Sequence, residues 1–493
     1  MAEKRQVHLA VDLGAGSGRV VAGIYNGSRL DLQELSRFPN DPVKQADGWH
    51  WNLDGLMKRI TDGVALAVKR FGADVVSLGA DTWGVDYGLL GPGQRLLHAP
   101  FHYRDARTQG MMEAAFQRMP SREIYERTGI QFMFFNTLFQ LLADSTVPGR
   151  LEKAERLLFM PDLIHFLLTG VASNEKSIAS TSQLLKPKNQ QWDFELIRTM
   201  GLPMKIFAET ANAGSILGKL KSQIIDDTGA YKLRVIAPAG HDTASAVVGV
   251  PADEASPVFL SSGTWSLFGR ELPQPVVTDA SYSAAFSNEG GVFGTIRFLR
   301  NIAGMWLLQE TKRAWDVSGN AMSYEQLMAD AEQAAPFTTC IDPNAEDFNA
   351  PPDMPTAISA FCRRTGQTAP TDRGAFTRMI LESLALKYRE VKNGLVQVTG
   401  VPVDTINVIG GGCQHDLLNQ FTADALDCIV VAGPTEATSI GNIVMQLHAL
   451  GEIRSLAEGR ALVRNSFKTR VFTPRNPEAW AEAETRFHRR LSS

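Results

Sequence analysis

The chain has 493 residues, 44% of them hydrophobic and 21% charged, a length and composition that predict a water-soluble globular protein with two large domains. Its 49 Lys and Arg stand against 53 Asp and Glu, a formal net charge of −4, so no basic field would gather nucleic acid. No stretch approaches the roughly 18 uninterrupted apolar residues that span a bilayer, and the first residues lack the pattern of a signal peptide, so we expect a cytoplasmic protein with neither nucleic-acid nor membrane partners.

Strand-like runs dominate the first 90 residues. They read VHLAVDL from residue 7, GRVVAGIY from residue 18 and DVVSLGADTWGVDYGLL from residue 74. Longer amphipathic stretches, which favour helices, follow between about residues 105 and 205. This order predicts an α/β domain with a mixed sheet.

The turn DLGAGSGR, from residue 12 to residue 19, carries three glycines between two strand-like runs. A Walker loop would need Lys and Ser or Thr after the last glycine, and a dinucleotide fingerprint would open a helix, so neither device fits. A bare hairpin turn lets several backbone N–H groups face one anion, and phosphate is the obvious guest. Turn geometry alone remains the competing interpretation.

Asp12 ends the first strand of this hairpin. A carboxylate there would be costly without a partner, and a magnesium ion or its water shell would satisfy it. Hydrogen bonds to the turn itself are the alternative.

The stretch DTWGVDYGLL places Asp81, Trp83, Gly84 and Asp86 in a strand context, and FHYRDARTQG follows soon after. Carboxylates, an aromatic face and a bare glycine resemble the lining of a carbohydrate site. Strand aspartates at turns and a core tryptophan are the structural alternative.

The stretch KLRVIAPAGHDTASAVVGV is predicted to run from a strand into a helix, with His241, Asp242 and Thr243 between the two. Asp242 fits an N-cap, or, beside a nucleotide phosphate, the proton acceptor for a substrate hydroxyl. Its ordinary pKa of about 3.9 would keep it charged at neutral pH. His241 would orient substrate or simply pack.

A second strand, small-residue turn and strand follow in ASPVFLSSGTWSLFGR, around Ser262, Gly263 and Thr264. This repeats the plan of the first hairpin without repeating its sequence. We place the domain boundary near the polar connection PADEASP, which gives an N-terminal domain of residues 1–245 and a C-terminal domain of residues 246–493.

Three further patterns lie in the C-terminal half. Residues 342–370 carry five prolines and are predicted to be a surface excursion. Helical spacing predicts one buried helix face that ends at Gly400 and consists of Ile380, Leu384, Tyr388, Val391 and Leu395. The strand from Thr405 to Ile409 meets three glycines and then a helix, which fits either a nucleotide lying on bare backbone or a plain tight turn.

The four cysteines are too few for a disulfide scaffold, and they form no Cys-x-x-Cys pair suited to zinc. We expect reduced and mostly buried thiols at Cys340, Cys362, Cys413 and Cys428.

Taken in order, six motifs resemble the FGGY carbohydrate kinases of the hexokinase, heat-shock-ATPase and actin superfamily. They are DLGAGSGR, DTWGVD, YRDARTQG, GHDTASAV, SSGTWSLFG and GGGCQHDLLNQFTADAL, and the resemblance runs from residue 10 to about residue 450. Finer details are most similar to members that act on L-rhamnulose: GAGSGR in place of the commoner Thr-Thr-Ser turn, GIQFMFFNTLFQL, HDTASAV, NEGG and RNIAGMWLLQE.

The resemblance implies two ribonuclease-H-like domains that close on an interdomain cleft, with ATP and magnesium on one side and a ketose on the other. It implies Asp242 as the proton acceptor and Asp12 as the magnesium residue, most readily through water. The residues that it implies for the sugar are Gly84, His241, Asp242, Thr243 and Asn301. Those that it implies for ATP are Ala15, Gly16, Ser17, Gly18, Arg19, Thr264, Gln309 and Gly411.

Other functions stay open at this point. A kinase of the same family for another ketose is the nearest alternative, because a single sequence does not show hydroxyl stereochemistry. A sugar-responsive regulator that lost catalysis would usually carry a helix-turn-helix, and here the first strand begins by residue 7. A dehydrogenase is disfavoured by the strand after Gly18. Oligomeric state is not readable from the sequence, and a monomer is the working assumption.

Overall fold

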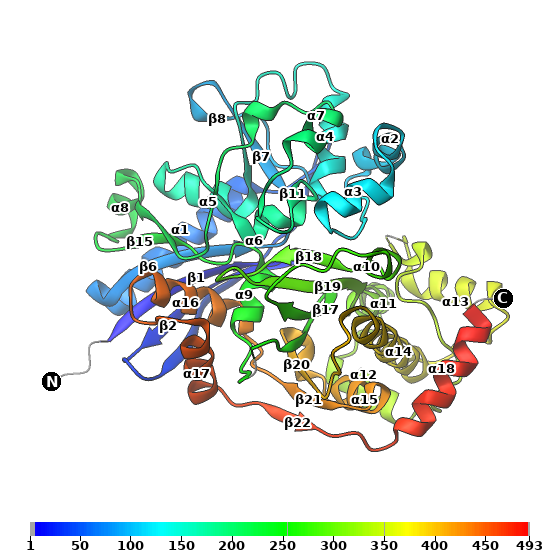
Figure 1. The fold of residues 1–493 in the computed structure, drawn as a ribbon. Coiled ribbons are helices and arrows are strands. Elements are labelled where there is room, and N and C mark those ends of the chain that lie inside the picture. Colours follow the sequence, from blue (N-terminus) through cyan, green and yellow to red (C-terminus); the bar gives the residue numbers. More distant parts are fainter. Residues whose placement is uncertain (1–4, 254, 350, 492–493) are drawn as a thin grey trace. The chain divides into compact units, whose positions relative to one another are not determined.

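The computed structural model describes residues 5–253, 255–349 and 351–491. Contacts between Cα atoms divide the chain into two compact units, drawn together in Figure 1. The first unit holds residues 1–256, 271–298 and 437–467, and the second holds residues 257–270, 299–436 and 468–493. Neither unit is therefore a single run of sequence, while the boundary at residue 245 stays a prediction.

A six-stranded mixed sheet forms the centre of the first unit, in the order β14-β15-β6-β1-β2-β3. The neighbours β15, β6 and β1 are parallel, and the outer pairings are antiparallel. The strands are β1 (Gln6–Leu13), β2 (Ser17–Tyr25), β3 (Leu30–Pro39), β6 (Val75–Thr82), β14 (Ser215–Lys219) and β15 (Arg234–Ala237). The mixed sheet and its first hairpin were both expected from the sequence.

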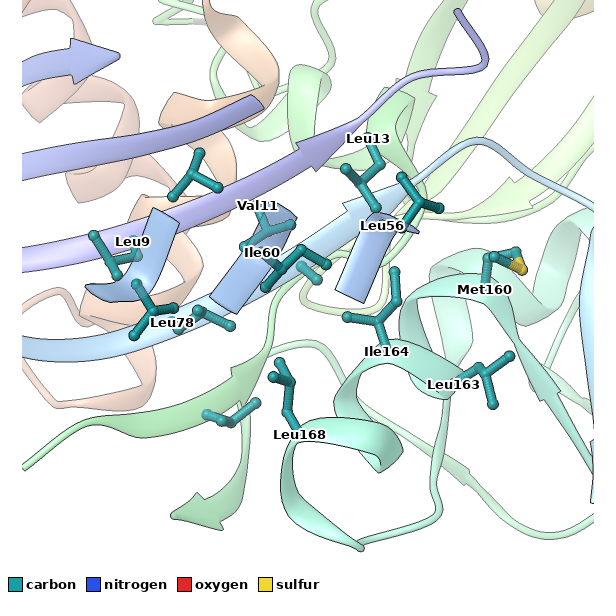
Figure 2. Packing of buried hydrophobic residues seen from close by; sticks show 14 of the residues in the cluster. Leu9, Val11, Leu13, Leu56, Ile60, Leu78, Met160, Leu163, Ile164 and Leu168 are labelled. Carbon is teal, nitrogen blue, oxygen red and sulfur yellow. The ribbon is translucent and has the colours of Figure 1, made fainter. Parts of the chain in front are cut away.

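Helices cover both faces of this sheet, because successive side chains of a strand point to opposite faces. Along β1, the side chains of Leu9, Val11 and Leu13 pack on one face against α1 (Leu53–Phe71) and α5 (Met160–Thr169), as Figure 2 shows. On the other face, Ala10 of β1 and Val21 of β2 belong to a second apolar cluster. The same cluster contains Ala244 of α9 (Asp242–Val248) and Ile440 and Ile443 of α16 (Ala437–Ala449). A helix from the last quarter of the chain therefore completes the first core.

The rest of the first unit consists of further helices and small sheets. The helices are α2 (Met111–Arg118), α3 (Ser121–Thr128), α4 (Thr137–Ser145), α6 (Lys176–Ala179), α7 (Phe194–Thr199), α8 (Ser222–Thr228), α10 (Asp279–Ser283) and α17 (Leu456–Ser466). The small sheets pair β4 (Val43–Gln45) with β5 (Gly48–His50), β7 (Tyr87–Gly91) with β8 (Arg95–Leu96) and β9 (Arg156–Phe159), β10 (Asn174–Glu175) with β13 (Thr210–Ala211), and β11 (Leu185–Lys186) with β12 (Gln191–Trp192).

A seven-stranded sheet, in the order β18-β19-β17-β16-β20-β21-β22, provides the strands of the second unit. β18, the start of β19 and the last two residues of β17 are counted in the first unit. The strands are β16 (Val258–Ser262), β17 (Trp265–Leu272), β18 (Ser287–Gly290), β19 (Ile296–Ala303), β20 (Thr405–Ile409), β21 (Ile429–Ala432) and β22 (Arg470–Phe472). The antiparallel pair β16 and β17 is the predicted second hairpin, and β20 runs parallel to β16.

The helices of the second unit include one long buried helix, α14, whose predicted apolar face is confirmed. It ends at Gly400, which takes a left-handed φ of 69° and donates its N–H to the carbonyl of Val396. The helices are α11 (Trp306–Val317), α12 (Tyr324–Gln333), α13 (Met354–Arg364), α14 (Arg373–Thr399), α15 (Asp416–Leu426) and α18 (Pro477–Leu491).

The prediction of a surface excursion over residues 342–370 is wrong in its centre, where α13 forms. Asp353 caps this helix by accepting a hydrogen bond from the N–H of Thr356, and Pro355 lies in its first turn, where proline is tolerated. Ile358, Phe361 and Cys362 are buried along it. Spacing of those apolar residues could have revealed the helix in spite of the prolines.

All four cysteines are free and buried in the structure, as expected. Burial raises the pKa of the Cys340 and Cys428 thiols to about 12, which fits inert structural thiols. Across the described ranges, none of the helices combines the length and the apolar character that a membrane crossing requires.

Candidate functional site

The carboxyl ends of β1, β6 and β15 meet at one edge of the first sheet, because these three strands are parallel. Asp12 and Asp81 occupy paired positions at the ends of β1 and β6. Thr82 donates its backbone N–H to the carbonyl of Gly240 at 2.9 Å, and Thr82 forms a parallel bridge with His241. The edge therefore gathers the first predicted aspartate and the segment that leads to Asp242, and such an edge is where ligands bind in open α/β sheets.

Asp12 is buried, and every hydrogen bond to its carboxylate ends on Oδ2. Arg19, its register partner on β2, donates from Nε at 3.0 Å and from Nη2 at 2.7 Å. Ser439 of α16 donates from Oγ at 2.9 Å. Oδ1 receives no hydrogen bond from the residues that the structure describes, so one carboxylate oxygen stays available.

Asp81 is fully buried beside it. Asn442 of α16 donates to its Oδ2 at 2.6 Å, and within the described residues Oδ1 has no hydrogen-bond partner. Burial, with the charge of Asp12 as a second cause, raises the pKa of Asp81 well above its usual range. The site thus holds a second carboxyl group that resists ionisation.

Asp242 is the first residue of α9, and its N-cap position is taken by His241. Its Oδ1 accepts hydrogen bonds from the Thr243 N–H at 2.5 Å and from the Thr243 hydroxyl at 3.2 Å. Its side chain is 30% exposed, and Oδ2 takes no hydrogen bond from the described residues. Burial raises the pKa of Asp242. The expected N-cap role is therefore replaced by a carboxylate with one oxygen anchored and the other unoccupied.

His241 lies between Asp242 and a buried ion pair. Its Nε2 is 3.4 Å from Asp242 Oδ1, and its Nδ1 is 3.2 Å from Glu289 Oε2 and 3.1 Å from Arg297 Nη1. A Cβ atom at Gly84 would come 3.3 Å from His241 Nε2, so the absence of a side chain keeps the space around this nitrogen open. Four of the predicted sugar residues are thereby brought together: Gly84, His241, Asp242 and Thr243.

Two hydrogen bonds hold the first residue of the glycine turn, Gly14. Gly14 donates its N–H to the carbonyl of Ser17 at 2.9 Å, and Asn40 donates its side-chain amide to the carbonyl of Gly14 at 2.9 Å. Gly16 is exposed, and a Cβ there would meet nothing within 4 Å. Gly18 is different, because a Cβ would come 2.4 Å from the Phe38 ring. Packing explains Gly18 but leaves Gly16 without a structural reason.

In the second unit, the predicted nucleotide residues Thr264 and Gln309 contact one another. The Thr264 hydroxyl donates to Gln309 Oε1 at 3.1 Å. The turn between β16 and β17 is held by the Met305 N–H, which donates to the Gly263 carbonyl at 2.9 Å, and by the N–H groups of Gly304 and Trp306, which donate to the Thr264 carbonyl at 3.1 Å.

The triple-glycine turn packs on the end of β16. A Cβ at Gly412 would come 2.0 Å from Ser262 Oγ, and Gly410 adopts a positive φ of 82° close to the Ser262 carbonyl. A Cβ at Gly411 would meet nothing within 4 Å. Only the middle glycine is therefore unexplained by packing, and it is the one predicted to bind ATP.

Asn301 lies on β19 and is counted in the second unit, whereas the other four predicted sugar residues are counted in the first. Asp86, considered for a sugar site, proves structural. Its fully buried carboxylate accepts hydrogen bonds from the indole N–H groups of Trp51 at 2.6 Å and Trp83 at 2.9 Å and from the amide of Gln140 at 2.8 Å. Burial raises the pKa of Asp86 to about 6.

Four polar residues at the site were missed from the sequence: Ser439, Asn442, Glu289 and Arg297. On α16, Ser439 and Asn442 lie three residues apart and share a face with Gln446. That polar spacing inside an apolar helix was a readable signal. Glu289 belongs to the NEGG motif that marked the resemblance, but nothing local tied it to His241.

Among the residues that the structure describes, no three His, Cys, Asp or Glu side chains are grouped closely enough to hold a metal ion by themselves. Within the described ranges, Asp12 and Asp81 each keep one carboxyl oxygen without a hydrogen bond; because Asp81 resists ionisation whereas Asp12 is paired with Arg19, Asp12 is the better ligand for a cation. Such hard oxygen ligands suit Mg²⁺, which commonly combines one or two carboxylates with waters and substrate phosphates.

Two family models match the chain. The model of the FGGY carbohydrate kinase N-terminal domain matches residues 7–249, and the model of the C-terminal domain of the same family matches residues 258–450.

Curated relatives match almost the whole chain. A rhamnulokinase of Bacteroides thetaiotaomicron is 43% identical over 98% of this chain and 99% of its own length. A rhamnulokinase of Halalkalibacterium halodurans is 40% identical over 95% of this chain and 99% of its own.

Solved structures of kinases share the fold. A gluconate kinase of Lactobacillus acidophilus superposes with a TM-score of 0.79 at 14% identity, over 98% of this chain and 97% of that one. A xylulose kinase of Rhodospirillum rubrum gives a TM-score of 0.78 at 16% identity, over 99% and 97%. The expected two-domain architecture is thereby confirmed.

Proposed function

The chain belongs to the FGGY family of carbohydrate kinases, and on that ground we propose that it transfers the γ-phosphoryl group of ATP to the 1-hydroxyl of L-rhamnulose. The product is L-rhamnulose 1-phosphate, and the reaction belongs to L-rhamnose catabolism in the cytoplasm. The observation that carries the choice of sugar is the 43% identity to a curated rhamnulokinase, because it extends over 98% of the chain and so covers both family domains.

Asp242 is the residue that accepts the proton of the sugar hydroxyl. Its Oδ2 takes no hydrogen bond from any residue that the structure describes, its Oδ1 accepts two from Thr243, and His241 and Gly84 border the same space. A raised pKa makes this carboxylate a better proton acceptor than an ordinary aspartate while it is ionised. Phosphoryl transfer has a loose transition state, so holding the hydroxyl in line contributes alongside the proton transfer.

The residues proposed for ATP lie in several segments of the chain. The first glycine turn and Arg19 receive the phosphates, and Thr264, Gln309 and Gly411 form the rest of the ATP site. Gly16 and Gly411 support the proposal, because packing does not explain why either position lacks a side chain: a Cβ there would meet nothing within 4 Å. Exclusion of water from the site would favour transfer to the sugar, because water competes with the sugar for the phosphoryl group.

Magnesium fits the residues near the first turn. Asp12 would hold the ion through its free Oδ1, most readily by way of a water molecule, and Arg19 keeps the other oxygen anchored. When bound with ATP, the ion neutralises developing charge on the transferred phosphoryl group.

A panel of ketoses tests the proposal. The purified protein is incubated with ATP, MgCl₂ and L-rhamnulose, L-fuculose, L-ribulose, D-xylulose or D-fructose, and ADP release is followed. We expect the highest kcat/KM with L-rhamnulose and a phosphate on O1 by ³¹P and ¹³C NMR. A higher kcat/KM for another ketose would reassign the substrate within the family, and no turnover of any sugar would support a non-catalytic protein.

A further inference from the structure

Arg297, on β19, is an unusually well-anchored side chain beside His241. Its side chain is 0% exposed. Its Nε donates to the carbonyl of Gly290 at 3.0 Å, and its Nη2 donates to the carbonyl of Ser177 at 3.5 Å. These two bonds fix the plane of the guanidinium, and they leave Nη1 as the group that faces His241.

The contact between Nη1 and the imidazole determines where the ring carries its proton. Nη1 lies 3.1 Å from His241 Nδ1 with the direction of a hydrogen bond. A guanidinium donates and cannot accept, so Nδ1 of His241 must be the acceptor. The proton of a neutral ring then lies on Nε2.

Glu289 offers the opposite possibility, because its Oε2 is 3.2 Å from the same Nδ1 and could accept a proton from it. Within the described residues, however, Oε2 makes no well-directed hydrogen bond, although it is 3.0 Å from Arg297 Nη1. Burial would raise the pKa of Glu289, but the charge of Arg297, whose Nη1 is 3.0 Å from Oε2, is the largest opposing cause, and the pKa is lowered. Glu289 is therefore ionised, and it balances the buried charge of Arg297.

The other ring nitrogen faces the site. Nε2 of His241 is 3.4 Å from Oδ1 of Asp242, and it borders the space that Gly84 leaves open. A proton on Nε2 would make this nitrogen a donor to a sugar oxygen next to the carboxylate. If Nε2 carried no proton, it would be a hydrogen-bond acceptor 3.4 Å from Oδ1 of Asp242, which is also an acceptor.

We propose that Arg297, with its charge balanced by Glu289, is a positioning residue that fixes His241 in the Nε2–H tautomer, so that the ring donates a hydrogen bond to the sugar beside Asp242. The inference rests on the proposed function, in which Asp242 takes the proton of the same sugar. It assigns Arg297 and Glu289 to sugar binding and leaves ATP binding to other residues.

The tautomer itself is measured by NMR, independently of turnover. Deuterated protein with ¹⁵N-labelled histidine gives long-range ¹H–¹⁵N correlations, and the variant His241→Asn assigns the signals of His241. We expect the pattern of a neutral ring protonated at Nε2. A ring protonated at Nδ1 in the wild-type protein would overturn the proposal, even if the enzyme phosphorylates L-rhamnulose.

Kinetics then test whether the tautomer matters for the sugar. For Arg297→Lys and Glu289→Gln we expect kcat/KM for the sugar to fall by about 10-fold or more, the size of a lost oriented hydrogen bond to substrate, while KM for ATP stays within about twofold. The matched control is Glu271→Gln, which disrupts another buried ion pair of the first unit, Glu271 with Arg460, whose side chains are 2% and 4% exposed. The control should lose stability without changing KM for the sugar.

A double-mutant cycle separates positioning from a merely structural role. If Arg297 acts through His241, Arg297→Lys should reduce kcat/KM little further in the His241→Asn background. A full additional loss there, or an equal rise in KM for ATP, would contradict the proposal. If Arg297→Lys does not fold, Glu289→Gln and the NMR measurement decide. Absence of any sugar turnover in the wild type would instead overturn the proposed function, and the NMR result would still stand.

Discussion

Ser439 donates a hydrogen bond of 2.9 Å to Asp12, although 427 residues separate them in the chain. Three residues further along the same helix, Asn442 donates to Asp81 at 2.6 Å. Positions three apart lie on one face of a helix, so one face of α16 donates hydrogen bonds to both Asp12 and Asp81. In Figure 1 this helix is drawn in orange beside the blue strands of the first sheet.

Among the described residues, Ser439→Ala removes the one donor other than Arg19 to the buried Asp12 carboxylate. We expect the free energy of unfolding to fall by about 1 to 3 kcal/mol, because a buried acceptor loses a hydrogen bond. Urea unfolding measures the change. Thr438→Ala, on the neighbouring and less buried position, is the control and should stay within about 0.5 kcal/mol of the wild type. Equal stability of the two variants would mean that the Ser439 bond contributes nothing.

Asp242→Asn keeps an oxygen that can accept the Thr243 N–H but removes the proton acceptor. We expect kcat to fall by about 10² to 10⁴, the usual size for a positioned base, with KM for ATP nearly unchanged. Steady-state kinetics with L-rhamnulose and ATP measure both, and an unaltered melting temperature confirms the fold. Near-normal turnover would leave Asp242 with a structural role only.

Gly16 and Gly18 form a matched pair in the first turn. Gly18→Ala should lower the free energy of unfolding by about 1 to 3 kcal/mol, since its Cβ would come 2.4 Å from the Phe38 ring and 2.6 Å from Leu13. Gly16→Ala should fold normally, because its Cβ meets nothing within 4 Å, yet raise KM for ATP. Denaturant unfolding and ATP kinetics on both variants separate the two effects. Unchanged ATP kinetics in Gly16→Ala would remove this turn from the nucleotide site.

Gly411 and Gly412 allow the same comparison in the second unit. Gly412→Ala should destabilise, because its Cβ would come 2.0 Å from Ser262 Oγ, whereas Gly411→Ala has free space. If ATP lies on Gly411, that variant should bind ATP more weakly at normal stability. Isothermal titration with a non-hydrolysable ATP analogue measures this. Wild-type affinity would show that only packing and turn geometry explain the three glycines.

Asp86 predicts a pH dependence of stability. Burial raises its pKa from 3.8 to about 6 in the folded chain, so the folded state binds the proton more tightly than the unfolded state. Its contribution to stability is full below about pH 4 and is lost as the pH rises through 6, by roughly 3 kcal/mol for about two pKa units. Asp86→Asn does not titrate.

The difference in unfolding free energy between Asp86→Asn and the wild type should therefore shift in favour of the variant between pH 4 and pH 7. Urea unfolding of both proteins at several pH values gives the difference directly, whatever the constant effect of the substitution on the Trp51 and Trp83 hydrogen bonds. A difference independent of pH would show that Asp86 does not titrate in this range in the folded state.

Local patterns were enough to predict the two hairpins, the strand that leads to α9 and the apolar face of α14, since strand alternation, helical spacing and glycine turns are written in neighbouring residues. Interpretation failed where partners are distant in sequence. The aspartates Asp12 and Asp81 were visible, but their donors on α16 were not, because only the folded chain brings residues 437–449 to β1 and β6. Asp86 was interpreted as a possible ligand residue because the sequence does not show that Trp51, Trp83 and Gln140 donate hydrogen bonds to its carboxylate.

The chain passes between its two units at residues 256/257, 270/271, 298/299, 436/437 and 467/468. During synthesis from the N-terminus, the first sheet is therefore translated long before α16, which covers the face that carries Ala10 and Val21. Until residue 449 has left the ribosome, the complete α16 cannot pack on that face. A fragment ending at residue 256 would therefore lack the α16 side chains that share a core cluster with Ala10 and Val21.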